Sequence, residues 1–221
     1  MPGKRRVGIL GGTFDPVHIG HLIIAEEARS RLELDEVVFV PAHDPWRKAR
    51  HDLAPAEERL AMVRLAVAGN PSFSVSLVDL DRQGPSYSVD TILDLRGQYG
   101  EEADLYFILG HDALMDLPHW RQPARLTELA HVVSVGRPGY EIGWQQLEEA
   151  LPNARERILV LDIPEVGISS TEIRQRVTSG LTIRYWVPEA VAQYIREQGL
   201  YQDASAGGIA TPEGRRTSDT P

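Results

Sequence analysis

Two histidines near the N-terminus offer the clearest chemistry in this sequence. His18 and His21 are separated by Ile19-Gly20, and Gly11-Gly12 comes shortly before them. On a helix this spacing puts both rings on one face, and the glycine between them leaves room for a ligand. The pair could donate to phosphate oxygens, bind a metal or be structural, but the chain has no cysteine and no third ligand lies nearby. Of these three roles, phosphate binding is the one that accounts for the glycines as well as the histidines.

The elements around the histidines predict a site at the end of a strand. Residues 7–10 are apolar and β-prone, Gly11-Gly12 predicts a turn, and Asp15 and Pro16 suit the N-cap and first position of a helix over about 16–31. In open α/β sheets, ligands bind outside the carboxyl ends of the strands, where helix N-termini present N–H groups to anions. This segment therefore predicts a nucleotide site.

The same segment resembles a known signature. Gly-Thr-Phe-Asp-Pro-x-His-x-Gly-His, residues 12–21, is similar to the motif of the H-x-G-H nucleotidyltransferase superfamily, and its longer form resembles bacterial nicotinate-mononucleotide adenylyltransferases. H-x-G-H itself is shared with phosphopantetheine adenylyltransferase, cytidylyltransferases and class I aminoacyl-tRNA synthetases. The choice among these families therefore depends on motifs later in the chain. The resemblance covers about residues 7–201 and implies that ATP contacts Gly11, Gly12, Thr13, Phe14, His18 and His21.

Composition limits the classes of protein that fit. The 221 residues are 42% hydrophobic and 25% charged, which is typical of a soluble globular chain with one domain. A formal net charge of −9 disfavours nucleic-acid binding. The sequence shows neither a signal peptide nor an apolar run near 20 residues, so we expect no membrane contact and a cytoplasmic location. The absence of cysteine suits that compartment.

A constrained basic loop follows the strand expected at residues 36–40. Residues 41–48 contain two prolines, a tryptophan and Arg47-Lys48, which fits a solvated loop as well as a binding loop. The resemblance adds a P-x-x-x-P-x-x-K pattern in which the lysine faces substrate phosphate. It therefore implies that Lys48 contacts nicotinate mononucleotide and helps catalysis.

Two further segments bear on which nucleotide the protein binds besides ATP. Ser86 or Ser88 could cap the helix that follows, because serine is a common N-cap residue. Trp120 could be a core residue, because most tryptophan side chains are largely buried. A tryptophan can also present its flat face to an electron-poor ring. The resemblance implies that Ser86, Tyr87 and Trp120, together with Thr13, line the pocket for nicotinate mononucleotide.

Gly110-His111-Asp112 lies at the end of the strand expected at residues 104–109. Asp112 could hold a ribose or a metal-bound water, or cap a short helix beginning at Ala113. The resemblance implies that Gly110 and Asp112 contact ATP, with His111 in place of a small residue.

A second strong motif is Ile-Ser-Ser-Thr-Glu-Ile-Arg, residues 168–174. Ser169 and Glu172 have the spacing of a capping box, but hydroxyls and free amides at a helix N-terminus also make a phosphate cradle. The resemblance to I-S-S-T-x-I-R implies that Ser169, Thr171 and Arg174 bind ATP phosphates.

The alternation of strand and helix patterns predicts a doubly wound, Rossmann-like nucleotidyltransferase fold of the α/β class with a mainly parallel sheet. We expect one domain over residues 1–202, with a small helical C-terminal part at about 164–202, and a disordered tail at 203–221. Other strands are expected at 73–77, 131–136 and 157–163, and other helices at 55–68, 144–151 and 189–198.

The resemblance implies adenylyl transfer from ATP to nicotinate mononucleotide, with His18, His21, Lys48 and Arg174 as the catalytic residues. Mg²⁺ would arrive with ATP, and no protein metal ligand is expected. Alternatives are another phosphate acceptor, such as nicotinamide mononucleotide or phosphopantetheine, and a nucleotide-binding protein without catalysis. The sequence leaves the oligomeric state open, a homo-oligomer included.

Overall fold

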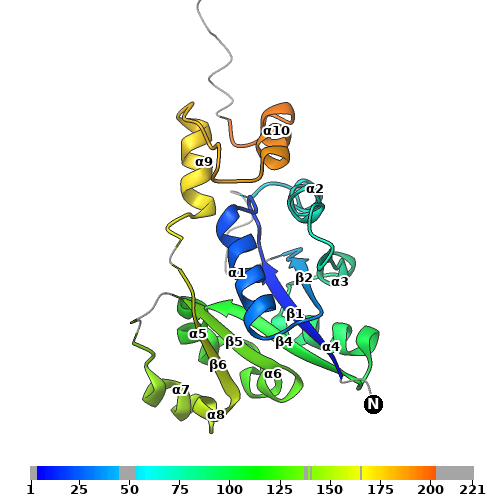
Figure 1. The fold of residues 1–221 in the computed structure, drawn as a ribbon, viewed down its shortest axis with the longest axis vertical. Helices are drawn as coiled ribbons and strands as arrows, with labels where there is room; N and C mark the ends of the chain where they lie inside the picture. The colour runs from blue at the N-terminus through cyan, green and yellow to red at the C-terminus, as the bar shows by residue number, and fades with distance from the viewer. Residues whose placement is uncertain (1–3, 45–52, 137–138, 140, 165, 203–221) are drawn as a thin grey trace, which may run out of the picture.

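A parallel six-stranded sheet forms the centre of the molecule, here a computed structural model that describes residues 4–44, 53–136, 139, 141–164 and 166–202 (Figure 1). Every pair of neighbouring strands is parallel, and the strand order is β3-β2-β1-β4-β5-β6. This is the order of the doubly wound dinucleotide-binding folds, so the predicted fold class is confirmed. The strands are β1 Arg5–Gly12, β2 Glu36–Pro41, β3 Phe73–Val75, β4 Ala103–Gly110, β5 His131–Gly136 and β6 Ile158–Asp162.

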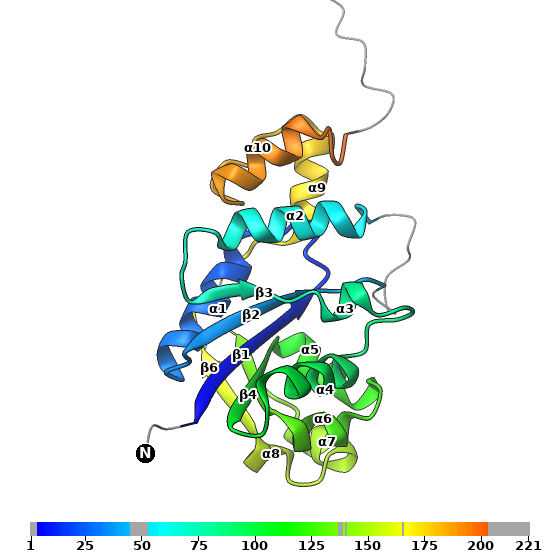
Figure 2. The same ribbon diagram turned by 90° about the vertical axis from the view of Figure 1, so that its right-hand side faces the viewer.

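Helices cover both faces of the sheet (Figure 2). One face carries α1 and α2, and the other carries α4, α5 and α6. The central strands are therefore buried on both sides, which explains their nearly unbroken apolar runs. The helices are α1 Ile19–Arg31, α2 Ala56–Val67, α3 Val78–Asp81, α4 Ser88–Tyr99, α5 His111–Asp116, α6 Pro123–Leu129, α7 Trp144–Ala150, α8 Ala154–Arg157, α9 Ser170–Thr178 and α10 Glu189–Glu197.

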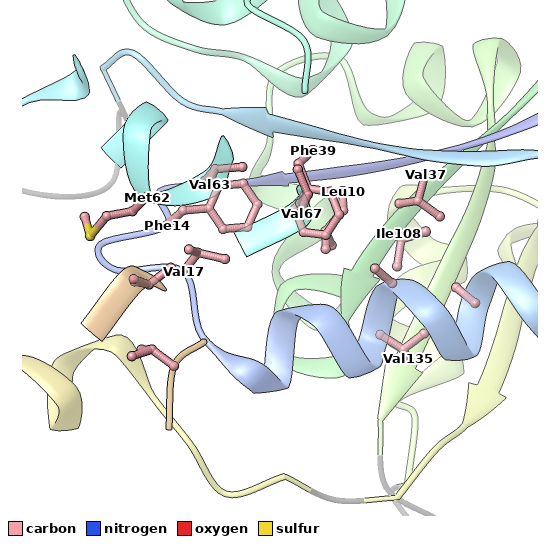
Figure 3. Close-up of a cluster of buried hydrophobic side chains, with 14 of the residues drawn as sticks. Leu10, Phe14, Val17, Val37, Phe39, Met62, Val63, Val67, Ile108 and Val135 are labelled. Carbon is pink, nitrogen blue, oxygen red and sulfur yellow. The ribbon is translucent and has the colours of Figure 1, made fainter. Parts of the chain in front are cut away.

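Each face of the sheet has its own apolar core. On the α1 side, Phe14 is 2% exposed and packs with Phe39, Met62 and Val63 (Figure 3). Burying one such aromatic side chain contributes about 2 to 3 kcal/mol. The helices α9 and α10 add Ile173 and other residues to this same core. The C-terminal helices are thereby fixed against the segment that follows β1.

The first predicted helix begins later than expected. It starts at Ile19 with His18 as the N-cap, whereas Asp15 and Pro16 precede it and are joined by a cis peptide bond. The carboxylate of Asp15 is buried and accepts hydrogen bonds from the Tyr201 hydroxyl at 2.7 Å and the Ala54 amide at 3.2 Å. Asp15 therefore binds distant parts of the chain and does not cap the helix.

The two glycines also differ from the expectation of a turn. Gly11 and Gly12 are the last residues of β1, and the left-handed residue of the following loop is Phe14, with φ of 51°. A side chain at Gly12 would place its Cβ 3.0 Å from the Phe14 ring. Gly12 is needed for this close approach and not for unusual dihedral angles.

Other expected caps are wrong as well. The N-cap of α4 is Tyr87, so neither Ser86 nor Ser88 occupies that position. The helix α5 begins at His111 with Gly110 as its N-cap, which places Asp112 inside the first turn. The short helices α3, α6 and α8 were not expected. The strands, and the helices α2, α7 and α10, agree with the predicted positions to within about two residues at each end.

Two expectations fall outside the described residues: the part of the basic loop that contains Arg47 and Lys48, and the tail at 203–221. Among the residues that are described, no helix has both the length and the apolar character needed to cross a bilayer.

Candidate active site

The predicted motifs meet at the carboxyl edge of the two central strands, β1 and β4. These strands are neighbours, but the chain leaves β1 toward β2 on one side and leaves β4 toward β5 on the other. Doubly wound sheets bind ligands at this kind of switch point. Gly12 and Gly110 end the two strands here.

Two cavities open at this edge. One, of about 500 Å³, is lined by His18, His111, Gly136 and Ile168 among others, and we name it the His18 cavity. The second, of about 600 Å³, is lined by Thr13, His21, Ser86 and Trp120 among others, and we name it the Trp120 cavity. The two share the lining residues Ile24, Gly110, Asp112 and Ala113.

The two histidines of the first motif lie where these cavities adjoin. The rings of His18 and His21 lie against each other, with centroids 3.7 Å apart and planes tilted by 32°. His18 faces one cavity and His21 the other. The absence of a side chain at Gly20 leaves room for the His18 ring, because a Cβ there would lie 3.0 Å from Nδ1 of His18. The spacing of the motif therefore does place both rings together, as predicted.

Hydrogen bonding determines which nitrogen of His21 carries a proton. The backbone N–H of His18 donates to Nδ1 of His21 at 3.1 Å. In the neutral ring the proton is then on Nε2, which makes that atom a hydrogen-bond donor. Burial lowers the pKa of His18 to about 4, so this ring is neutral at pH 7 and also carries a single N–H.

The wall of the Trp120 cavity includes most of the expected acceptor residues. Ser86 accepts from the backbone N–H of His43 at 3.0 Å, which connects the loop before α4 to the loop after β2. Trp120 donates its indole N–H to Asp116 at 2.9 Å. Tyr87 is not among the described residues that line this cavity; its ring lies against Arg121, whose Cζ is 4.7 Å from the ring centroid.

Asp79 is a residue of this wall that the sequence analysis missed. It is 6% exposed, accepts from the Thr91 hydroxyl at 2.6 Å and pairs with Arg82 at 3.1 Å. Burial raises the pKa of its carboxyl, although both partners oppose that effect. One feature of the sequence indicated that Asp79 is buried: it stands between the apolar residues Val78 and Leu80, shortly before the Gly-Pro-Ser-Tyr segment.

His111 forms part of the wall of the His18 cavity. Its Nδ1 lies 2.6 Å from the Ser134 hydroxyl, and burial lowers its pKa. The ring takes the space of a side chain at Gly136, where a Cβ would be 2.1 Å from Cδ2 of His111. Asp112 next to it is exposed and borders both cavities.

The second motif packs against the first. Ser169 is the N-cap of α9 and accepts from the Glu172 amide at 3.1 Å, so the predicted cap is confirmed. Ser170 donates to the Pro16 carbonyl at 2.9 Å, and Arg174 donates to the Asp15 carbonyl at 2.8 Å. Segments about 155 residues apart in the chain are thereby joined at one edge.

The structure places the predicted phosphate-binding residues in different settings. Ser169 and Thr171 are exposed at the N-terminus of α9, and Arg174 is partly buried against Asp15. These three are not among the described residues that line either cavity. The side chain of Phe14 lies in the core, which leaves only its backbone to contact a nucleotide. Lys48 lies outside the described residues.

Arg59 is a second residue that the sequence analysis missed. Its buried guanidinium donates to four backbone carbonyls: Thr13 at 2.8 Å, Ala42 at 2.7 Å, Ala54 at 3.0 Å and His43 at 3.2 Å. Burial lowers its pKa from the usual value. The signal was an arginine four residues before Val63, on the apolar face of a predicted helix.

Comparison with known proteins shows the family to which this chain belongs. Residues 9–176 match the family of cytidylyltransferase-like proteins, and the chain belongs to this family. The chain is 46% identical over 209 residues to a probable nicotinate-nucleotide adenylyltransferase of Saccharopolyspora erythraea, covering 94% of this chain and 95% of that protein. It is 50% identical over 196 residues to one of Roseiflexus sp., covering 89% and 98%. Within the family, the chain belongs to the nicotinate-nucleotide adenylyltransferases.

A solved structure supports the fold. The nicotinic acid mononucleotide adenylyltransferase of Plasmodium falciparum complexed with NaAD is 20% identical, with a TM-score of 0.71, and the match covers 89% of this chain and 97% of that one. At this identity the likeness shows the fold alone.

Proposed function

We propose that this protein transfers the adenylyl group of ATP to nicotinate mononucleotide, giving deamido-NAD (nicotinate adenine dinucleotide) and pyrophosphate. The observation that carries the proposal is the pair of adjoining cavities with His18 facing one and His21 the other. Group transfer between two nucleotides needs two pockets whose contents meet at a point lined by hydrogen-bond donors. Membership in the nicotinate-nucleotide adenylyltransferases gives the substrates.

The two cavities differ in ways that assign one substrate to each. The Trp120 cavity has an indole and the hydroxyl of Ser86, which suit the aromatic ring and the polar groups of nicotinate mononucleotide. The His18 cavity lies beside α9, whose exposed N-terminus with Ser169 and Thr171 suits the ATP phosphates. The exposed carboxylate of Asp112, which borders both cavities, suits the ATP ribose hydroxyls.

The reaction requires no nucleophile from the protein. A phosphate oxygen of nicotinate mononucleotide attacks the α-phosphorus of ATP in line; the new P–O bond forms as the bond to the β-phosphate oxygen breaks, and pyrophosphate leaves with that electron pair. The attacking phosphate is ionised at neutral pH and needs no strong base. Positioning of the two substrates can supply about 7 to 11 kcal/mol.

His18 and His21 stabilise the charge that develops during transfer. The neutral ring of His18 and the Nε2–H of His21 donate to phosphoryl oxygens at the junction of the cavities. Arg174, held by the Asp15 carbonyl, and Lys48 offset further negative charge. Arg174 would reach the phosphates from the edge of the site, since its side chain retains partial exposure.

We propose that Mg²⁺ enters with ATP, bound by phosphate oxygens. Among the described residues no group of three or more His, Cys, Asp or Glu side chains is placed to hold a metal ion. When bound, Mg²⁺ neutralises phosphate charge in the transition state. We also expect a cytoplasmic enzyme that binds neither nucleic acid nor membrane, in keeping with the net charge of −9.

Pyrophosphate release tests the proposal. The protein is incubated with ATP and Mg²⁺ and with nicotinate mononucleotide, nicotinamide mononucleotide or phosphopantetheine in parallel. A strong preference for nicotinate mononucleotide is the expected result. A preference for another acceptor would overturn the substrate assignment, and ATP binding without release in any mixture would show a nucleotide-binding protein without this catalysis.

A further inference from the structure

The indole ring of Trp120 is fixed on two sides. Its N–H donates to Oδ2 of Asp116 at 2.9 Å. The ring of Phe107, from β4, meets it at 78° with centroids 6.2 Å apart. Trp120 and Asp116 both line the Trp120 cavity. A ring held at its N–H edge and packed by a neighbour has few other orientations open to it.

Asp116 and Trp120 belong to the same short segment of the chain. It is the last residue of α5, and the buried Leu117 begins the 3₁₀ turn Leu117–His119 that connects it to Trp120. The backbone N–H of Trp120 donates to the Leu117 carbonyl at 3.0 Å. Backbone and side chain of the tryptophan are therefore held by the same short segment, which leads directly from the carboxyl edge of β4.

We infer that Asp116 is a positioning residue for acceptor binding: by accepting the indole N–H it holds the face of Trp120 toward the acceptor's ring. This inference rests on the proposed function. The ring of nicotinate mononucleotide is a pyridinium, and a cation is attracted to the face of an indole but not to its edge. A tryptophan free to rotate would lose that contact for part of the time, and the cost would fall on the acceptor and not on ATP.

The test is steady-state kinetics of three single variants of the full-length protein. Asp116→Leu removes the acceptor oxygen at similar volume, and the acceptor KM should rise about fivefold or more while kcat and the KM for ATP stay within about twofold. Asp116→Asn keeps an oxygen that can accept the N–H and should restore a KM near that of the wild type. Asp81→Leu, an exposed aspartate of α3, is the matched control and should change nothing.

A double-mutant cycle separates positioning from direct contact. Trp120→Phe keeps an aromatic face but has no N–H, so adding Asp116→Leu to it should raise the acceptor KM no further. The positioning role is overturned if Asp116→Leu has the same effect in both backgrounds, because Asp116 would then act on the acceptor itself. It is also overturned if Asp116→Asn is as impaired as Asp116→Leu.

The failure of this inference differs from the failure of the proposed function. Wild-type turnover with an unchanged acceptor KM in Asp116→Leu overturns the positioning role alone. Absence of turnover with every acceptor in the wild type overturns the proposed function, and the positioning role with it.

Discussion

The imidazole rings of His18 and His21 lie against each other, with centroids 3.7 Å apart and planes inclined by 32°. Burial lowers the pKa of His18 to about 4. His18 is thus a neutral donor above that pH. Its function as a donor and its burial both have measurable consequences.

Replacement of His18 by alanine should lower kcat much more than it weakens ATP binding. The variant loses a donor to the transferred phosphoryl group, which typically costs about 100-fold or more in kcat. Kinetics with saturating ATP and a direct ATP-binding titration measure the two effects. His131→Ala is the control, since His131 is exposed at the opposite end of the sheet. Equal kcat in His18→Ala and wild type would contradict the donor role.

The stability of the protein should fall in acid because of His18. Its pKa is lowered from 6.5 to about 4 on folding, so between these values the unfolded chain binds a proton that the folded chain does not. The free energy of unfolding is unaffected by this group at pH 7 and should drop by about 2 to 3 kcal/mol at pH 4.5. Urea unfolding of wild type and His18→Gln at both pH values measures it. The same loss in both proteins would refute the assignment to His18.

Arg59→Met should destabilise the fold strongly. The change leaves the carbonyls of Thr13, Ala42, His43 and Ala54 without their shared donor. Each buried acceptor left unpaired costs about 1 to 3 kcal/mol, so the total should reach at least about 3 kcal/mol in urea unfolding. Arg64→Met, at an exposed position of the same helix, should stay within about 0.5 kcal/mol of wild type. A similar effect of the two variants would exclude the proposed role of Arg59.

Tyr201→Phe should loosen the C-terminal segment. The Tyr201 hydroxyl donates to the buried Asp15 carboxylate at 2.7 Å, and burial together with this carboxylate raises the pKa of the tyrosine. Loss of a bond to a buried charged group costs about 1.5 to 3 kcal/mol. Urea unfolding is the measurement, with Tyr185→Phe as the control because Tyr185 is 82% exposed. An unfolding free energy equal to that of the wild type would mean that the bond contributes nothing.

Local sequence determined the strands, most helices and the chemistry-bearing motifs. Apolar runs such as residues 104–109 predicted the central strands because a parallel strand is buried on both faces, and Ser169 with Glu172 predicted the start of α9 because that cap is made within four residues. The spacing of His18 and His21 placed their rings together for the same reason: the interaction is local.

Tertiary structure alone decided the interactions between distant segments. Asp15 has the residue type and position of an N-cap, yet its carboxylate accepts hydrogen bonds from Tyr201 and the Ala54 amide. Packing brings those partners to it, and the helix begins at Ile19 with His18 as its N-cap instead. Arg59 lies on the apolar face of a helix, and its guanidinium donates to four carbonyls of two connections, the one between β1 and α1 and the one between β2 and α2. The sequence shows which residues carry hydrogen-bonding groups. Packing between segments far apart in the chain determines which of these groups are removed from water and which protein group becomes their partner.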